Sequence, residues 1–262
     1  MHSKEPENRD TTEGYWDGIR WPLGGSGGKL SGSAFYFGRR GVFSKLVEDR
    51  FGNIAGKSVL KFGGGGNNFR LLAMVKWLGA TGTALDFSEK GLHVVKDLFG
   101  ANGCDASFIK QDICEWTPIE QYDFVVHWGV LEHFVDPLPI LRKSAEALKP
   151  GGTLLFSMPN MEAVAARLWK KWSPENWSKH VLHPTELIES TLSEIEFRDI
   201  SSFYFGVPFF KTVEWETKSV AQYPVDLMQT LGSAAARIFP VWHRMGHRLV
   251  SMERGFCARK GE

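Results

Sequence analysis

Short apolar runs alternate with amphipathic stretches along the chain from residue 42 to about residue 160. Each aliphatic or β-branched run ends in a polar or glycine-rich turn, and apolar positions at helical spacing follow the turn. Strand and helix alternate five times with short loops, which predicts a mostly parallel sheet with helices on both faces. Strands are expected at 59–60, 82–85, 107–110, 123–127 and 153–158, and helices at 42–50, 69–78, 88–99 and 138–148.

Two further strands are expected towards the end of the chain. One lies near 197–203, and the final stretch GFCARK gives the other, which closes the sheet. The fold class is therefore α/β, a Rossmann-like and mostly parallel sheet of seven strands with an N-terminal lid and helical insertions. In such sheets ligands bind at the carboxyl ends of the strands, where Asp86, Asp112 and His127 fall.

A glycine turn follows the first strand. Gly63 to Gly66 precede a helical pattern, and glycine lets a bound group approach the backbone where a Cβ would clash. Gly63 and Gly65 keep the first spacing of both the GxGxxG turn of dinucleotide binders and the GxGxG-like turn of S-adenosylmethionine binders. Asn67 or Asn68 replaces the third glycine, so the turn predicts a ligand cradle without deciding between the two.

Composition favours one domain. With 262 residues, 43% of them apolar, the chain is expected to form an arm or lid over 1–41 and one domain over 42–262, with insertions at about 161–184 and 206–248. A net charge of +1 gives no reason to expect a nucleic-acid partner. Three cysteines without a CxxC pair argue against zinc, and we expect no metal. A polar N-terminus and reduced thiols favour a cytoplasmic protein, with contact to a membrane surface left open.

The motifs in chain order resemble a known family. VLKFGGGGNN, GTALDFSEKGL, FIKQDI and YDFVVHWGVLEHFVDPLPILRKSAEALKPGGTLLFSMPN follow one another at separations similar to those of class I S-adenosylmethionine-dependent methyltransferases. The similarity covers roughly residues 42–160 and is greatest to the branch that modifies small molecules, quinones and sugars. It implies S-adenosyl-L-methionine as the cofactor.

The resemblance also implies which residues bind that cofactor. Asp86 would hold the ribose hydroxyls, since a carboxylate accepts two hydrogen bonds from a vicinal diol. The alternatives are that Asp86 only caps the next helix and that Asp112 is a solvated loop carboxylate. The residues expected at the cofactor are Arg40 (or Arg39) for its carboxylate, Gly63, Gly65 and Asn67 for its methionine part, Phe87, Asp112 and Ile113 for its adenine, and His127 and Trp128.

Two positions depart from the family pattern. Lys61 stands where the family usually has Asp or Glu, and Asn67 stands where it has glycine. A lysine ammonium turned inward would oppose the positive charges of the cofactor, unless it reaches solvent or a carboxylate. Asn tolerates a left-handed backbone better than other non-glycine residues, so Asn67 is compatible with the turn.

Histidines are the candidate proton acceptors for a hydroxyl substrate. His133 and His127 flank the loop after the fourth strand, and either could take the proton. The rival interpretation is that His133 and Glu132 fix the loop by hydrogen bonds. His180 and His183 form a second cluster, which we expect to contact the acceptor together with His133, Trp16 and Trp21. A metal site at His180 and His183 on one helix face is the less favoured use.

The insertions are expected to select the acceptor. Apolar positions between Met161 and Trp172 form one helical stripe, which indicates either a helix over a pocket or one in a bilayer interface. Aromatic residues at 209–245 suit a bulky or lipid-linked acceptor, or association of chains, and we expect a monomer or a homodimer.

The sequence therefore predicts methyl transfer to a small or medium-sized acceptor, with oxygen in a sugar, phenol or other natural-product or lipid-linked compound favoured. Methylation at nitrogen or carbon is the first alternative. A degenerate relative that binds without transferring is the second, because of Lys61 and Asn67. A nicotinamide oxidoreductase is a distant third, since it leaves the LEH and LKPGG segments unexplained.

Overall fold

The computed structural model describes residues 11–18, 39, 41–66, 68–206, 220–228, 231 and 246–262. Within them, seven strands form one sheet in the order β3-β2-β1-β4-β5-β7-β6. The strands are β1 (Ser58–Phe62), β2 (Thr81–Asp86), β3 (Ser107–Lys110), β4 (Tyr122–Trp128), β5 (Leu148–Pro159), β6 (Phe197–Phe205) and β7 (Glu253–Lys260). The first five pair in parallel, and β7 runs antiparallel between β5 and β6. The predicted seven-stranded, mostly parallel sheet is confirmed.

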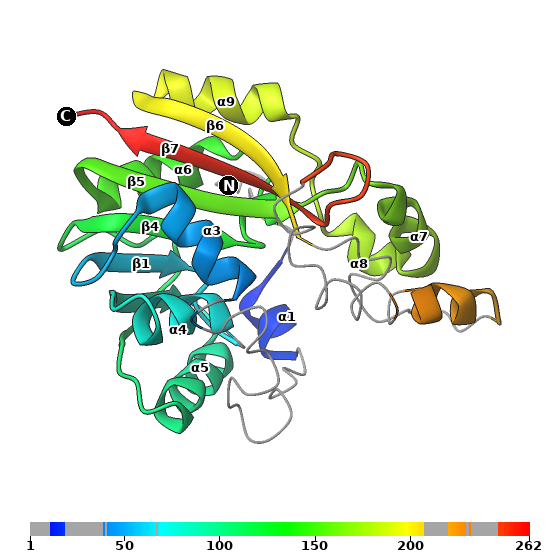
Figure 1. Ribbon diagram of the computed structural model, residues 1–262, viewed down its shortest axis with the longest axis horizontal. Helices are drawn as coiled ribbons and strands as arrows, with labels where there is room; N and C mark the ends of the chain where they lie inside the picture. The colour runs from blue at the N-terminus through cyan, green and yellow to red at the C-terminus, as the bar shows by residue number, and fades with distance from the viewer. Residues whose placement is uncertain are drawn as a thin grey trace, which may run out of the picture.

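Helices cover both faces, because successive side chains of each strand point to opposite sides. Val59 and Val126 pack with α3 (Val42–Phe51), α4 (Phe69–Lys76) and α5 (Glu89–Ala101). Leu60 and Val125 pack on the other side with α6 (Leu138–Ala147) and α9 (Thr185–Glu194). Figure 1 shows α1 (Glu13–Gly18) beyond the carboxyl end of β1, on the side where α7 (Val164–Trp172) and α8 (Pro174–Ser178) also lie.

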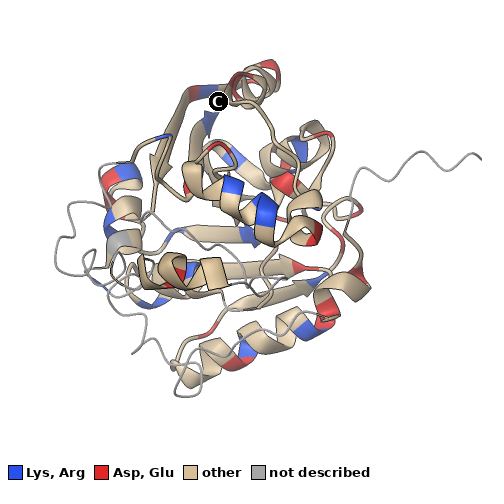
Figure 2. Ribbon diagram, turned by 90° about the vertical axis from the view of Figure 1, so that its right-hand side faces the viewer, with Lys and Arg blue, Asp and Glu red and all other residues tan. Residues whose placement is uncertain are grey.

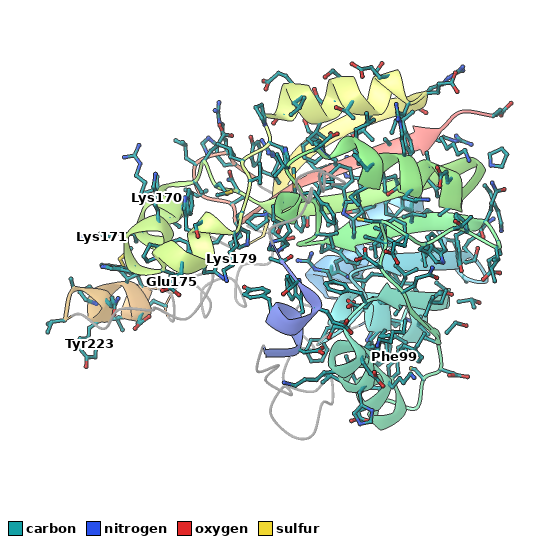
Figure 3. All side chains as sticks on the ribbon, turned by 180° about the vertical axis from the view of Figure 1, so that it is seen from behind. Phe99, Lys170, Lys171, Glu175, Lys179 and Tyr223 are labelled. Atoms are coloured by element: carbon teal, nitrogen blue, oxygen red, sulfur yellow. The ribbon has the colours of Figure 1, made fainter. Side chains whose placement is uncertain are left out.

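The Trp-bearing stripe of the first insertion faces the protein. Ala166, Trp169 and Trp172 of α7 are buried, while Lys170 and Lys171 lie on its outer side, away from the sheet (Figure 3). Trp169 and Trp172 pack against the protein and so are not free to enter a bilayer, while no residue of α7 is among those that line the described cavity. No described helix is long and apolar enough to cross a membrane.

Several predicted boundaries need correction. The fifth strand begins at Leu148, so the LKPGG turn belongs to the strand rather than preceding it, and the helix expected from Met161 begins at Val164. His180 and His183 lie in the irregular segment between α8 and α9, so they do not share a helix face. Most of the second insertion, and the aromatic residues expected there, lie outside the described residues.

Charges of both signs are interspersed over the helices that face the viewer in Figure 2. This pattern fits the balanced composition of the chain, and the absence of a nucleic-acid partner stays a prediction.

His127 is part of the core. Its ring stacks between Phe62 and Phe156, with centroid distances of 6.3 and 4.6 Å, and its side chain is fully buried. Neither ring nitrogen has a hydrogen-bond partner among the described residues. Burial, with a smaller effect of the Lys61 charge, lowers the pKa of His127 to about 3. The structure thus corrects the prediction that His127 contacts the cofactor or accepts a proton, because the ring is enclosed by aromatic side chains.

We expect His127→Phe to stabilise the protein. Removing two buried nitrogens without partners should raise the free energy of unfolding by about 1 kcal/mol at pH 7.5. The unfolded chain protonates His127 below its ordinary pKa and the folded chain does not, so the wild type loses stability as pH falls below that value. At pH 5.5 the advantage of the variant should grow by about 1.4 kcal/mol. Urea unfolding at both pH values measures this, and an advantage that does not grow on acidification contradicts it.

Candidate functional site

The turn between β1 and α4 packs too tightly for side chains. Gly63 has φ +60°, and a Cβ on it would lie 2.7 Å from Val130 Cγ2. A Cβ on Gly64 would lie 2.6 Å from that of Ala84 on the neighbouring strand. Asn68 caps α4 by accepting a hydrogen bond from Leu71 N–H (3.2 Å), and its side-chain amide donates to Gly64 O (2.9 Å). The loop is thereby fixed against the carboxyl ends of β1 and β2.

Asp86 at the end of β2 connects this turn to the start of α5. Its Oδ2 accepts a hydrogen bond from Gly65 N–H and its Oδ1 accepts one from Ser88 N–H, each at 2.8 Å. Each carboxylate oxygen keeps a second lone pair for another donor. Burial raises the pKa of Asp86, and the two N–H groups and the Lys61 charge oppose that rise.

A cavity of about 370 Å³ opens at this end of the sheet. Its walls come from the glycine turn, the ends of β2 and β4, the start of α4 and the N-terminal α1. Of the residues predicted from the sequence, Trp16, Gly63, Gly65, Asp86, Phe87, Ile113, Trp128 and His133 line it. Arg40, Asn67 and Trp21 lie outside the described residues. The sequence therefore located the cavity, although not every residue of its wall.

Asp112 is a correction to the predicted set. Its neighbours Gln111 and Ile113 line the cavity, but Asp112 does not. Its Oδ1 accepts a hydrogen bond from Cys114 N–H (2.9 Å), and its backbone carbonyl accepts one from Trp116 N–H (2.8 Å). The carboxylate thus makes a hydrogen bond within its own loop, where the alternative interpretation expected a solvated group. Gln111, which the sequence gave no reason to select, is better placed for a polar contact.

Another part of the cavity wall is aromatic. His133 belongs to the 3₁₀ turn η2 (Leu131–His133), and Trp16 on α1 meets its ring edge-on with centroids 5.2 Å apart. His180 lies behind His133 with centroids 4.7 Å apart, next to Trp169 at 4.8 Å. Neither His180 nor His183 lines the cavity. His183 is buried, with Nε2 3.0 Å from Phe134 O, so the predicted direct contact with an acceptor is corrected for both histidines.

Comparison with known proteins decides the family. A family described as a methyltransferase domain matches residues 37–201, more than half of the chain. The chain belongs to this methyltransferase family. Its predicted membership of the class I S-adenosylmethionine-dependent methyltransferases is thereby confirmed, and so is the cofactor of that class.

Curated relatives of the methyltransferase include two "ubiquinone biosynthesis O-methyltransferases". That of Klebsiella pneumoniae is 31% identical over 163 residues, 56% of this chain and 66% of the relative. That of Citrobacter koseri is 31% identical over 153 residues, 54% of this chain and 62% of the relative. The chain thus matches slightly less than two thirds of each relative's length.

Solved structures show the same fold at lower identity. A methyltransferase from Archaeoglobus fulgidus has a TM-score of 0.54 and 18% identity, covering 88% of this chain and all of that one. Phosphoethanolamine N-methyltransferase 2 from Haemonchus contortus has a TM-score of 0.57 and 18% identity, covering 92% of this chain and 59% of that one.

The residues of the methyltransferase fit its cofactor. Side chains are excluded from the turn at Gly63 and Gly64, and Gly65 approaches the Asp86 carboxylate so closely that a Cβ there would lie 3.0 Å from Oδ2. A carboxylate held by two backbone donors suits the ribose hydroxyls, and Phe87 and Ile113 offer apolar surface for a base.

Lys61 is the feature that opposes cofactor binding. Its side chain lines the cavity, and its Nζ donates hydrogen bonds to Phe62 O (3.1 Å) and to Gly63 O. The ammonium is held by backbone carbonyls, and among the described residues no carboxylate accepts a hydrogen bond from it, although the Asp86 charge lies close enough to favour its protonated form. Burial lowers the pKa of Lys61 to about 7, with Asp86 opposing and Arg70 adding to the shift. Its charge is therefore present below neutral pH and lost above it.

Arg70 is a cavity residue that the sequence did not reveal. It lies at the start of α4, and its guanidinium forms a two-pronged ion pair with Glu253 on β7. Ser157 Oγ donates to Glu253 Oε2 at 2.6 Å. The partners are 183 positions apart in the chain, so no local pattern announces the pair. It connects the cofactor end of the cavity to the closing strand.

We expect Asp86→Asn to weaken S-adenosylhomocysteine binding by tenfold to a hundredfold, because the charge that accepts the ribose hydrogen bonds is lost. Hydrogen bonds to charged groups contribute about 1.5–3 kcal/mol. Asp112→Asn is the matched control and should change the dissociation constant by less than about threefold, since Asp112 does not line the cavity. Isothermal titration calorimetry measures both, and equal losses would contradict the assignment.

The Lys61 charge should make cofactor preference depend on pH. S-adenosylmethionine carries a sulfonium charge that its demethylated product lacks, so a charged Lys61 disfavours the substrate form. On going from pH 8 to pH 6, the dissociation constant of S-adenosylmethionine divided by that of the demethylated product should rise by roughly three- to tenfold. Lys61→Met should abolish this shift. Calorimetry with both ligands tests it, and a wild-type ratio that is the same at both pH values would refute the role of Lys61.

Proposed function

We propose that this protein transfers the methyl group of S-adenosylmethionine to an oxygen of a small or medium-sized acceptor. The observation that carries the proposal is one cavity lined both by a ribose-suited carboxylate, Asp86, and by an imidazole, His133, whose Nδ1 is held by a backbone carbonyl. The relatives named above are O-methyltransferases of ubiquinone biosynthesis, which favours a phenolic hydroxyl on a lipid-linked compound.

His133 is the proposed catalytic base. Its Nδ1 lies 3.0 Å from Lys179 O, and because a carbonyl only accepts, Nδ1 carries the hydrogen. The lone pair of the neutral ring is then on Nε2, the nitrogen that takes the acceptor's proton. When bound, the cofactor supplies a methyl group already activated on a sulfonium. The protein has to align the acceptor, exclude water and remove one proton.

Trp16 and Phe134 are the proposed acceptor contacts. Both line the cavity near His133, and Trp16 also packs against its ring. α1 is fixed over the cavity by Ser88 Oγ, which donates to Asp17 Oδ1 (2.5 Å), and by Lys90 Nζ, which donates to Asp17 O (2.6 Å). A planar aromatic acceptor placed between these side chains would meet the base while α1 keeps out water.

Lys61 favours a second candidate, a cofactor-fold relative that binds without transferring. Its ammonium donates to the Gly63 carbonyl, a group that a ligand in the turn would otherwise reach.

The proposal also includes a cytoplasmic location, contact with a membrane surface, and a monomeric or dimeric state. Lys170 and Lys171 on the outer side of α7 offer a basic surface for such contact (Figure 3).

The decisive experiment incubates the protein with methyl-labelled S-adenosylmethionine and a panel of catechols, prenylated phenols, sugars and amines. We expect label in an O-methyl ether of a phenolic acceptor, identified by mass fragmentation. His133→Asn should lower kcat about a hundredfold and leave S-adenosylhomocysteine affinity unchanged within twofold, since the base acts only on the acceptor. Binding of the cofactor without transfer to any compound would favour the second candidate, and label on nitrogen would contradict the oxygen assignment.

A further inference from the structure

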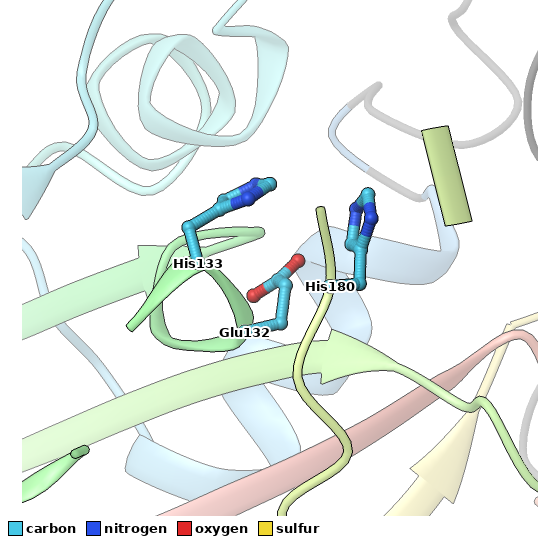
Figure 4. Close-up of side chains that lie close together, drawn as sticks. All are labelled: Glu132, His133 and His180. Carbon is cyan, nitrogen blue, oxygen red and sulfur yellow. The ribbon is translucent and has the colours of Figure 1, made fainter. Parts of the chain in front are cut away.

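Three proton-accepting side chains, two of them buried and one half-buried, converge next to the cavity. One carboxylate oxygen of Glu132 and one ring nitrogen each of His133 and His180 lie within 4.8 Å of one another. Glu132 and His133 come from η2, and His180 comes from the segment after α8. Figure 4 shows the Glu132 carboxylate between the two imidazole rings.

Backbone carbonyls fix the tautomers of both rings. His180 Nδ1 lies 2.7 Å from Asn176 O, as His133 Nδ1 lies close to Lys179 O. Each Nδ1 therefore carries the hydrogen, and each neutral ring has its lone pair on Nε2. Each imidazole of the cluster therefore has one basic nitrogen, Nε2.

Glu132 adds a third acceptor. The residue is 2% exposed, and its Oε2 is buried with no hydrogen-bond partner among the described residues. A buried carboxyl oxygen without a donor is costly, so the arrangement needs a reason. Burial, together with the charge of Glu253 on β7, raises the pKa of Glu132 to about 8. Burial also lowers the pKa of His180. Glu132 therefore keeps its proton to a higher pH than an ordinary carboxyl does, whereas His180 gives up its proton more readily than an ordinary imidazole.

We propose that Glu132 and His180 complete a proton-accepting cluster with His133, which takes and holds the proton that the acceptor hydroxyl loses during methyl transfer. This rests on the function proposed above. The acceptor's O–H bond breaks as an N–H bond forms on His133. The acceptor oxygen bonds to the methyl carbon as the carbon–sulfur bond breaks, and the Glu132 carboxylate compensates the new imidazolium. Only His133 lines the cavity, so Glu132 and His180 are positioning residues.

The surroundings of the cluster decide the sign of its pH dependence. Trp16 of α1 and Trp169 of α7 cover the rings with uncharged surfaces. The Lys179 ammonium lies 4.1 Å from the centre of the Tyr15 ring, and the negative charge nearby is that of Glu253. A neutral carboxylic acid cannot compensate an imidazolium, so the rate should rise with pH as the cluster loses its resting proton. The apparent pKa of that rise belongs to the cluster as a whole.

Glu132→Gln and His180→Asn test the cluster, with His183→Asn as the matched control. His183 is also buried and bonded to a backbone carbonyl, but it lies outside the cluster. We expect kcat to fall tenfold or more in the first two variants, with S-adenosylhomocysteine affinity within twofold of wild type as the check on folding. The rise of kcat with pH should disappear in Glu132→Gln and persist in His183→Asn.

Two results would overturn the proposal. One is a Glu132→Gln enzyme that binds S-adenosylhomocysteine normally and keeps the wild-type kcat and pH profile. The other is one equivalent of a divalent metal ion that dialysed wild-type protein retains and Glu132→Gln loses. Glu132 Oε2 would then be a metal ligand rather than part of a proton-accepting cluster.

An NMR titration, which needs no turnover, distinguishes failure of this inference from failure of the proposed function. Histidine ring resonances of the S-adenosylhomocysteine complex should show His133 and His180 titrating together, and Glu132→Gln should shift both while leaving His183 in place. If no acceptor is methylated yet the titrations are coupled, the proposed function fails and the cluster stands as a proton store. Independent titrations in wild type would refute the cluster even in an active enzyme.

Discussion

The site depends on the hydrogen bond between Gly65 N–H and the Asp86 carboxylate, and on the close approach that it requires. The turn can reach Asp86 only because its residues lack Cβ atoms, and the carboxylate can remain at this buried position because two backbone donors hold it. The geometry joins β1, β2, α4 and α5 at one point. The junction also adjoins other walls of the cavity, since Ser88 at the start of α5 donates to Asp17 of α1 and Gly63 packs close to Val130 of the loop before His133.

Buried polar groups divide into two kinds in this protein. His127 stacks between aromatic rings, and its two ring nitrogens have no hydrogen-bond partner in the described part of the chain, so its cost is structural. Glu132 is equally buried, but its carboxylate adjoins two imidazoles next to the cavity. Burial is the main cause of the pKa shift of both residues. A buried residue in the core and a buried residue at a reactive site differ in the groups that lie close to them. The degree of burial does not report that difference.

Two cationic side chains near the cofactor end give the cavity an unusual electrostatic balance. Arg70 is neutralised by Glu253, whereas the hydrogen bonds that the Lys61 ammonium donates within the described part of the chain go to two backbone carbonyls. The first interaction stabilises the connection between α4 and β7 whatever the cofactor state. The hydrogen bonds of Lys61 hold an ammonium whose charged form is already disfavoured by burial. Binding of a ligand in the cavity and protonation of Lys61 are therefore linked. The same substitution that departs from the family pattern therefore gives this protein a sensitivity to pH near neutrality.

The sequence by itself determined the sheet, the glycine cradle and the acidic strand end. These follow from local rules: apolar periodicity, the absence of Cβ atoms in a turn, and the position of Asp86 after a strand. The tertiary structure alone decided which of the marked residues meet. His127 and Asp112 both stand at strand ends, yet the alternation of side chains turns His127 into the core, and a local turn draws Asp112 out of the cavity wall. Arg70 and His180 gained their roles from partners distant in the chain, and a one-dimensional pattern cannot report such contacts because they exist only once the sheet has closed.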